Sequence, residues 1–124
     1  MQDRRRLRAG TTTQALAFQL DACCADGRIE AMVVADGDGL ALASSGDRYA
    51  CDEVAARIVL VGSRIREFNG TLLGGGFRWD VQMVKVDVAG SELLVCAVGG
   101  SPEQRRRQIA RGADGARRIL ATAA

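Results

Sequence analysis

Two aspartates and two glycines alternate at Asp36-Gly37-Asp38-Gly39, between two apolar runs. Aspartates at this spacing occur as positions 1 and 3 of calcium loops, and glycine-rich loops can hold a phosphate. The calcium pattern fails at positions 5, 6 and 12, which here are Leu40, Ala41 and Asp47. The phosphate-loop pattern fails because no Lys-Ser/Thr pair follows, either here or after Gly74-Gly75-Gly76. A turn between two strands is the better interpretation.

The usual catalytic side chains are scarce. The chain has no histidine, the commonest general base, and its one lysine, Lys85, lies in the middle of a predicted strand. No side-chain pattern typical of nucleophilic or phosphoryl-transfer chemistry is found. We therefore expect a protein that is not an enzyme, with no catalytic residues and no cofactor.

Four cysteines are the remaining reactive groups, and their spacing does not favour a zinc site. Cys23 and Cys24 are adjacent, Cys51 and Cys96 lie in apolar surroundings, and no Cys-x-x-Cys pair occurs. We expect buried, reduced thiols and no bound metal. The N-terminus has no apolar signal segment and no run approaches the roughly 18–20 apolar residues of a membrane span, so the expected location is cytoplasmic.

Composition and charge indicate one globular domain of 124 residues, of which 48% are hydrophobic and 26% charged. The positive charge lies at the two ends. Residues 1–10 carry four arginines and one aspartate, and residues 103–124 carry six arginines and two acidic residues. We interpret these ends as a basic tail over residues 1–10 and a solvated helix face within a domain over residues 11–124.

The first half of the chain predicts a helix followed by a hairpin. Thr11 and Gln14 fit a capping box for a helix over residues 12–26. Two apolar runs, residues 29–36 and 40–45, flank the turn. The first run is apolar on both of its faces, which indicates a sheet covered by helices on both sides.

A middle helix is predicted over residues 53–68, with Asp52 as its cap and Asn69-Gly70 at its end. One side is an apolar stripe that should face the sheet: Val54, Ile58, Val61, Ile65 and Phe68. A second, narrow apolar line lies on the opposite side, flanked by charges. We interpret this outer side as a dimer or partner interface, formed by Ala56, Arg57, Leu60, Ser63, Arg64 and Glu67.

The second half predicts an irregular connection over residues 71–80, with a possible short edge strand near residues 77–79. Strands follow at residues 81–88 and 91–98. Ser101-Pro102-Glu103-Gln104 is typical of a helix start, and an inward stripe of Ile109, Ala113, Ala116 and Leu120 continues it. The order is α-β-β-α-β-β-(β)-α, an α+β fold with a central antiparallel sheet of four to five strands.

This combination resembles a Roadblock/LC7 domain over roughly residues 12–122. The resemblance lies in GRIEAMVVADGDGLALASSG, in the helix that opens DEVAARI, in the hairpin VQMVKVDVAGSELLVCAVGG and in the capped terminal helix. It implies one helix on one face of the sheet and two on the other. It also implies homodimers through the middle helix and the adjoining edge strand, and no fixed catalytic motif.

The resemblance further implies a function as an adaptor. Bacterial members of this family commonly regulate or scaffold small Ras-like GTPases, including those that set cell polarity in gliding bacteria. We therefore expect a homodimeric regulator that binds such a GTPase or its polarity and motility complex. An alternative is an adaptor for a paralogous Roadblock protein or scaffold, with no direct contact to the GTPase.

Two alternatives come from other classes of protein. Helix-covered sheets of this size also bind small ligands, although the sequence shows no polar cluster that would line a pocket. The arginine-rich ends could bind nucleic acid, but Phe18, Tyr49, Phe68, Phe77 and Trp79 are scattered along the sequence and predict no stacking platform. We expect no nucleic-acid partner.

Overall fold

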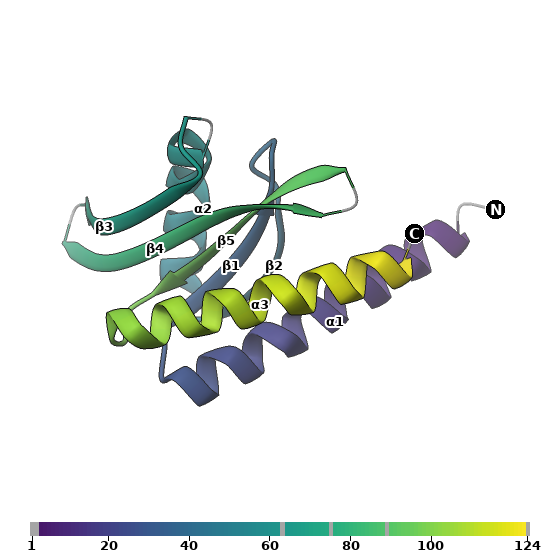
Figure 1. The fold of residues 1–124 in the computed structure, drawn as a ribbon, viewed down its shortest axis with the longest axis horizontal. Coiled ribbons are helices and arrows are strands. Elements are labelled where there is room, and N and C mark those ends of the chain that lie inside the picture. The colour runs from purple at the N-terminus through teal and green to yellow at the C-terminus, as the bar shows by residue number, and fades with distance from the viewer. Residues whose placement is uncertain (1–2, 63, 75, 89, 124) are drawn as a thin grey trace.

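The computed structural model describes residues 3–62, 64–74, 76–88 and 90–123, which form three helices and one five-stranded antiparallel sheet (Figure 1). The strands are ordered β2-β1-β5-β4-β3 across the sheet. In chain order, the elements are α1 (Asp3–Gly27), β1 (Ala31–Asp36), β2 (Ala41–Gly46), α2 (Arg48–Gly62), β3 (Glu67–Gly74), β4 (Phe77–Val88), β5 (Ser91–Val98) and α3 (Pro102–Ala123).

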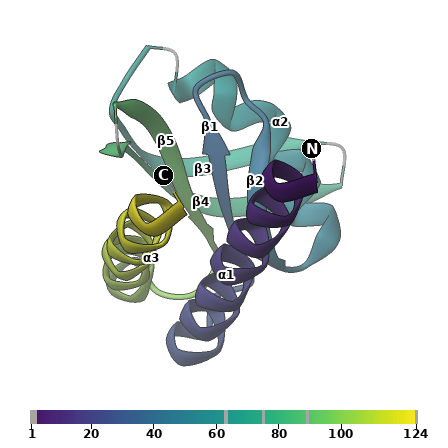
Figure 2. The same cartoon turned by 90° about the vertical axis from the view of Figure 1, so that its right-hand side faces the viewer.

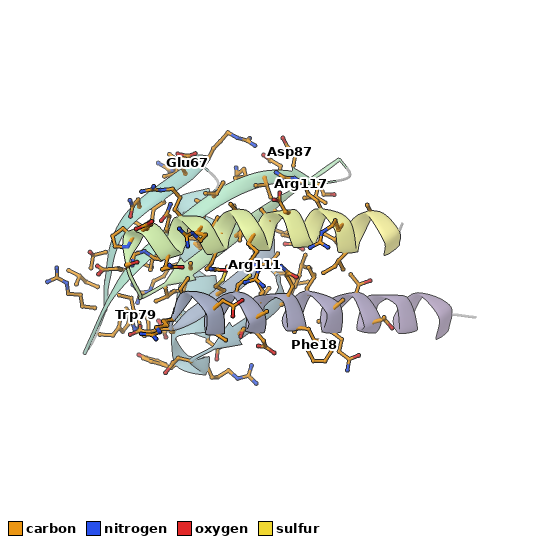
Figure 3. The ribbon with its side chains drawn as sticks, turned by 60° about the horizontal axis from the view of Figure 1, so that its bottom comes forward. Phe18, Glu67, Trp79, Asp87, Arg111 and Arg117 are labelled. Atoms are coloured by element: carbon orange, nitrogen blue, oxygen red, sulfur yellow. The ribbon has the colours of Figure 1, made fainter. Side chains whose placement is uncertain are left out.

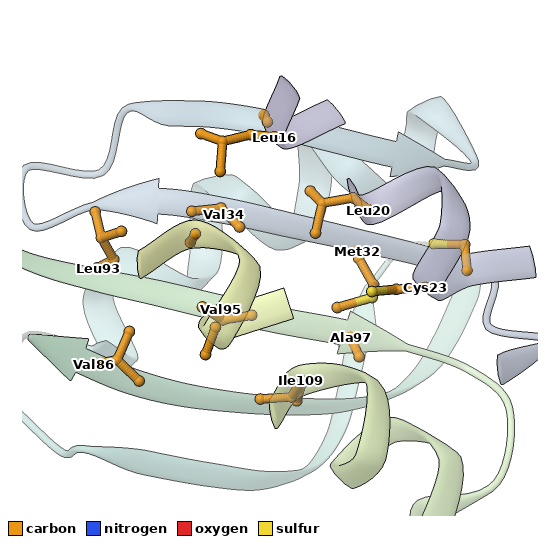
Figure 4. Close-up of a cluster of buried hydrophobic side chains, with 14 of the residues drawn as sticks. Leu16, Leu20, Cys23, Met32, Val34, Val86, Leu93, Val95, Ala97 and Ile109 are labelled. Carbon is orange, nitrogen blue, oxygen red and sulfur yellow. The ribbon is translucent and has the colours of Figure 1, made fainter. Parts of the chain in front are cut away.

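Helices cover both faces of the sheet, as expected from the apolar first strand. α1 and α3 run side by side on one face, and α2 lies on the other (Figure 2). Met32 and Val34 of β1 pack against α1 and α3, whereas Ala31, Val33 and Ala35 pack against α2. Figure 4 shows the first of these two cores, to which Leu16 and Leu20 of α1 and Ile109 of α3 contribute on the same face of the sheet. The α+β fold predicted from the sequence is confirmed.

The alternating aspartates and glycines form the β1–β2 turn, as predicted. The Asp36 carboxylate Oδ1 accepts hydrogen bonds from the backbone N–H groups of Asp38 and Leu40, both at 2.9 Å. The Asp36 carbonyl accepts another from Gly39 N at 3.0 Å, and Gly39 has a φ of 92°. Aspartate is favoured here because its side chain replaces missing backbone partners, and glycine because it has no Cβ to oppose a positive φ.

The first helix begins at Asp3, so the capping box predicted at Thr11 is wrong. Thr11 lies within α1, where its backbone follows the helix. A Thr-x-x-Gln pattern indicates a helix start only where the preceding residues do not continue the helix. Here the arginines, the leucine and the alanine before Thr11 have favourable helix propensities, and the helix continues through Gly10. The division into a tail of residues 1–10 and a domain from residue 11 stays a prediction.

The middle helix begins and ends earlier than predicted. Its cap is Asp47, whose Oδ1 accepts the N–H of Ala50 at 2.8 Å, and it ends at Gly62. A Cβ at Gly62 would lie 2.7 Å from both methyl carbons of Leu94 on β5, so the glycine permits close packing against the sheet. The predicted inner stripe is correct at Val54 and Ile58, which are fully buried.

The segment after this helix forms the edge strand β3. The sequence predicts instead that the helix continues to residue 68 and that an irregular connection follows from residue 71. Exposure alternates along β3: Phe68 and Leu72 are half-buried, and the residues between them at 69 and 71 are exposed. All eight residues of β3 pair with β4, from Glu67 opposite Val84 to Gly74 opposite Phe77. The residues near 77–79 that were considered for a separate edge strand are the start of β4.

The last helix begins as predicted. Ser101 Oγ accepts the N–H of Gln104 at 3.1 Å, and Ile109, Ala113 and Ala116 are buried. Arg105 is an exception to the expected solvated arginine face, because it is only 4% exposed. Its Nη1 donates to the carbonyl oxygens of Gly99 and Gly100, both at 2.8 Å, and so holds the turn between β5 and α3.

Candidate interaction surface beside the middle helix

The outer side of α2 carries the exposed apolar line expected from the sequence. Leu60 is 73% exposed, and Ala56, one helical turn earlier, is also exposed. Tyr49, 54% exposed, lies near the start of the same helix. A leucine this exposed on a helix whose other side is fully packed indicates a surface that a partner could cover.

Two of the six predicted interface residues lie outside this helix. Arg64 is exposed but lies in the turn after Gly62, and Glu67 is the first residue of β3. Ser63 is outside the described residues. The helix ends early because β3 must begin near Glu67 to pair with β4, so the outer side of α2 itself is shorter than the predicted stripe.

Arg57 is already engaged within the chain. Its Nη1 donates to the Leu73 carbonyl at 3.2 Å, its Nη2 pairs with Glu53 at 3.4 Å, and its guanidinium lies 5.1 Å from the centre of the Phe77 ring. The arginine therefore ties α2 to the end of β3 and to the start of β4. These contacts restrict its reach, so Arg57 is better placed to shape this surface than to extend into a partner's active site.

An aromatic cluster adjoins Arg57, and the sequence-based reasoning missed it. Phe77 and Trp79 stack with ring centres 4.0 Å apart, and Tyr49 meets Trp79 edge-on at 5.5 Å. The view that the aromatic residues are scattered is therefore wrong for these three. The signal was present: Phe77 and Trp79 are two residues apart, which places them on the same face of a strand.

This cluster does not support the alternative of nucleic-acid binding. Trp79 packs against the core on the α2 face of the sheet, whereas the arginines of α3 lie on the opposite face. A single-strand site needs stacking rings beside basic side chains. Here the arginine-rich helix α3 and the rings lie on different faces of the sheet, and Arg57, the arginine beside the rings, is engaged by Glu53 and by the Leu73 carbonyl.

The free edge of the sheet borders the same region. β3 is the last strand in the order and pairs only with β4 among the described residues. Its outer backbone groups, apart from the Leu73 carbonyl that accepts from Arg57, can pair with another strand, and Leu73 is 66% exposed at its end. An exposed apolar helix side and an unpaired strand edge thus meet where Arg57 joins α2 to β3.

The reactive groups considered at the start form no alternative site in the described part of the chain. There, no three His, Cys, Asp or Glu residues are grouped so that they could hold a metal ion. All four cysteines are free and buried, and burial raises the pKa of each thiol above its ordinary value. Among the described helices, none is both long and apolar enough for a membrane span.

No family model matches the sequence, and no curated protein matches it either. Solved structures do match. A structure of MglB with tetrameric arrangement has 18% sequence identity and a TM-score of 0.66, and the match covers 91% of this chain and 93% of that one. The fold is that of MglB. The gliding protein MglB from Thermus thermophilus gives 17% identity and a TM-score of 0.64, over 90% of this chain and 92% of that one.

Myxococcus xanthus MglB is a more distant match, with 13% identity and a TM-score of 0.57 over 90% of this chain and 92% of that one. The MglB structures are of the Roadblock/LC7 type, so the resemblance stated from the sequence is confirmed at the level of the fold. Identities this low establish how the chain folds. The function has to be argued from the surface described above.

Proposed function

We propose that the chain forms a homodimer through the outer side of α2 and the edge of β3, and that this dimer regulates a small Ras-like GTPase by binding it or its polarity complex. The exposed apolar line ending at Leu60, beside an unpaired strand edge, carries the proposal. Its support from the fold is that MglB structures, one of them described as tetrameric, share this architecture.

Two-fold pairing fits the shape of the surface. An antiparallel strand edge can pair with its own symmetry copy, because both edges present the same alternation of donors and acceptors. Such pairing of β3 with its copy would continue the sheet across the dimer and bring the two α2 helices together. Leu60, 73% exposed in the single chain, would then be buried.

A regulatory role without turnover is consistent with the chemistry of the chain. It has no histidine, its thiols are buried, and no phosphate loop occurs in the sequence. The protein would act on a GTPase by positioning the GTPase's own residues or by scaffolding it. An arginine supplied in trans is the other established route, and it accelerates hydrolysis about 10³–10⁵-fold.

Arg64 is the arginine to test for that second route. From the sequence, Arg57 and Arg64 were both expected on a helix, where an arginine reaches poorly into a nucleotide site. In the structure Arg64 is exposed in the turn after α2, so that argument no longer applies to it. Arg57, held by Glu53 and by the Leu73 carbonyl, remains a poor candidate.

The test mixes the purified dimer with a purified small Ras-like GTPase, loaded with GDP or with a GTP analogue. Calorimetry measures binding, and phosphate release measures hydrolysis. We expect binding that depends on the nucleotide, with hydrolysis changed by less than about a hundredfold, below the range of an arginine supplied in trans. If hydrolysis is accelerated about a thousandfold and Arg64→Ala abolishes this acceleration, the positioning mechanism is wrong and Arg64 is the arginine supplied in trans.

Absence of binding in both nucleotide states would refute a direct GTPase contact. The same dimer would then be tested against a paralogous Roadblock protein, the alternative partner, by co-purification. Turnover of GTP by the dimer alone would refute the non-catalytic part of the proposal.

A further inference from the structure

Two adjoining hollows follow one side of α3, on the face of the sheet opposite α2. The first, about 270 Å³, lies between α3 and β4, and the second, about 450 Å³, opens from it toward β3. Gln82, Val84 and Arg106 line both hollows. Figure 3 shows Glu67 and Arg117 on the side of α3 that faces away from α1, Glu67 toward the second hollow and Arg117 beside the first. We call the two hollows together the α3 groove.

The groove exists because α3 covers β4 and β5 but does not extend over β3. Its floor is apolar, formed by Val84 and Val86 of β4 and Ile109 and Ala113 of α3. From Arg106 to Arg117 it follows three turns of helix, or roughly 16 Å at 1.5 Å per residue. An extended peptide rises about 3.3 Å per residue, so about five residues would fill this length.

Three polar groups in the groove lack partners among the described residues. Gln82 Oε1 is buried with no hydrogen-bond donor. Both the Arg106 guanidinium and the Glu67 carboxylate line the second hollow, and neither has an ion pair or side-chain hydrogen bond among the described residues. A buried acceptor without a donor lowers the free energy of unfolding. Two opposite charges that do not pair with each other can each form an ion pair with a charged group of a ligand.

Other arginines of α3 are satisfied within the chain, which makes Arg106 distinct. Arg107 pairs with Glu103 at 3.4 Å, Arg111 with Asp26 at 2.7 Å, and Arg117 with Asp114 at 2.9 Å. At the far end of the groove, the Arg117–Asp114 pair therefore adds no net charge. The unpaired charges are confined to the end where Arg106 and Glu67 lie.

We infer that the α3 groove binds an extended segment of a partner protein in which a basic, an acidic and a branched aliphatic residue follow one another. The acidic side chain pairs with Arg106 and the basic one with Glu67. The aliphatic side chain packs on Val86 and Ile109, and Gln82, whose Oε1 is buried, borders the segment. A peptide fits better than a compact small molecule, because the groove is open along its length and its polar and apolar parts are separated along it.

The groove and the outer side of α2 lie on opposite faces of the sheet, although Glu67, Phe68 and Asn69 at one end of the groove belong to β3, the strand whose outer edge is part of the proposed dimer surface. The experiment pans a random octapeptide phage library against the immobilised full chain and synthesises the enriched peptides with a fluorescent label. Their binding is measured by fluorescence polarisation, and amide shifts of the 13.1 kDa chain map the site. We expect enriched peptides with an acidic residue next to a branched aliphatic one, and shifts over residues 82–86 and 106–113.

The matched variants are Arg106→Ala and Arg107→Ala. They remove the same charge from neighbouring exposed positions, but Arg107 does not line either hollow. Arg106→Ala should weaken the peptides about fivefold, the upper range for an exposed ion pair, and Arg107→Ala should leave them unchanged. Arg106→Glu should select peptides with a basic residue in place of the acidic one, a result that mere loss of folding cannot give.

Three results would overturn the inference. The first is that no peptide is enriched, and the second is that the enriched peptides bind Arg106→Ala as tightly as the unmodified chain. The third is that the shifts fall on α2 and the aromatic cluster. Free L-leucine or a single-stranded oligonucleotide that shifts the groove while the peptides do not would assign it to another ligand and equally refute a peptide site. None of these outcomes bears on the proposed dimer, whose failure is seen in the oligomeric state.

Discussion

At the scale of single residues, Gly46 at the end of β2 has the closest approach of neighbouring backbone among the glycines whose surroundings the structure describes. Its φ is 98°, and a Cβ there would run into the carbonyl oxygen of Glu30 and lie 2.8 Å from the Cα of Ala31. Gly46→Ala should therefore lower the free energy of unfolding by at least about 2 kcal/mol, from backbone strain and steric overlap together. Urea denaturation at fixed protein concentration measures it.

Gly90 provides the matched control for this substitution. Its φ is also positive, at 83°, but a Cβ there would meet nothing within 4 Å. Gly90→Ala should cost only the backbone strain, about 1 kcal/mol. Equal losses for the two variants would show that the close approach to Glu30 contributes nothing.

Asp36 gives a second prediction at this scale. Its Oδ1 already accepts two backbone N–H groups, and Asp38 is the only other acidic residue of the turn. Calcium requires about six to eight oxygen ligands, so we expect that about 5 mM calcium leaves the melting temperature unchanged. Magnesium at the same concentration controls for ionic strength. A rise of several degrees with calcium alone would mean that the turn is a metal site.

At the scale of elements, the two candidate helix caps can be compared directly. Ser101 Oγ caps α3, whereas Thr11 lies inside α1. Ser101→Ala should lower the free energy of unfolding by about 1 kcal/mol, the usual cost of a lost N-cap. Thermal or urea unfolding followed by circular dichroism gives the difference.

Thr11→Ala serves as the control in the same measurement. Alanine has a higher helix propensity than threonine, so this substitution should leave stability unchanged or raise it by a few tenths of a kcal/mol. A loss of about 1 kcal/mol at Thr11, the usual cost of a lost cap, would instead place the start of the first helix where the sequence pattern predicted it.

At the scale of the whole molecule, we expect a homodimer at tens of micromolar. Leu60→Arg would place a charge in the apolar centre of the proposed interface, and leaving it unpaired there would cost several kcal/mol. The variant should therefore be monomeric with its fold retained. Light scattering measures the mass, and circular dichroism checks the fold.

Leu40 offers the matched control, because it is 66% exposed and lies on the β1–β2 turn, outside both α2 and β3. Leu40→Arg should remain dimeric. If the unmodified chain scatters as a monomer of 13.1 kDa at this concentration, the proposed interface is wrong. If both variants remain dimeric, the chain associates through another surface.

The sequence by itself determined the features that depend on local chemistry. The β1–β2 turn follows from aspartate and glycine, the start of α3 from Ser101, and the helices on both faces from a first strand that is apolar on both sides. Ala56 and Leu60 were also correctly placed on an exposed helix side, because helical periodicity fixes which residues share a face.

Only the tertiary structure decided where α2 ends and that a strand comes after it. The apolar residues at 65 and 68 continue the helical spacing, but the backbone of residues 67–74 gains its hydrogen bonds from β4, a contact that no local pattern encodes. The close packing of Gly62 on Leu94, the clustering of Tyr49 with Trp79, and the meeting of Arg106 with Gln82 all join residues far apart in the chain. Such contacts form only when the sheet brings its strands together, so their residues were visible in the sequence but their arrangement was not.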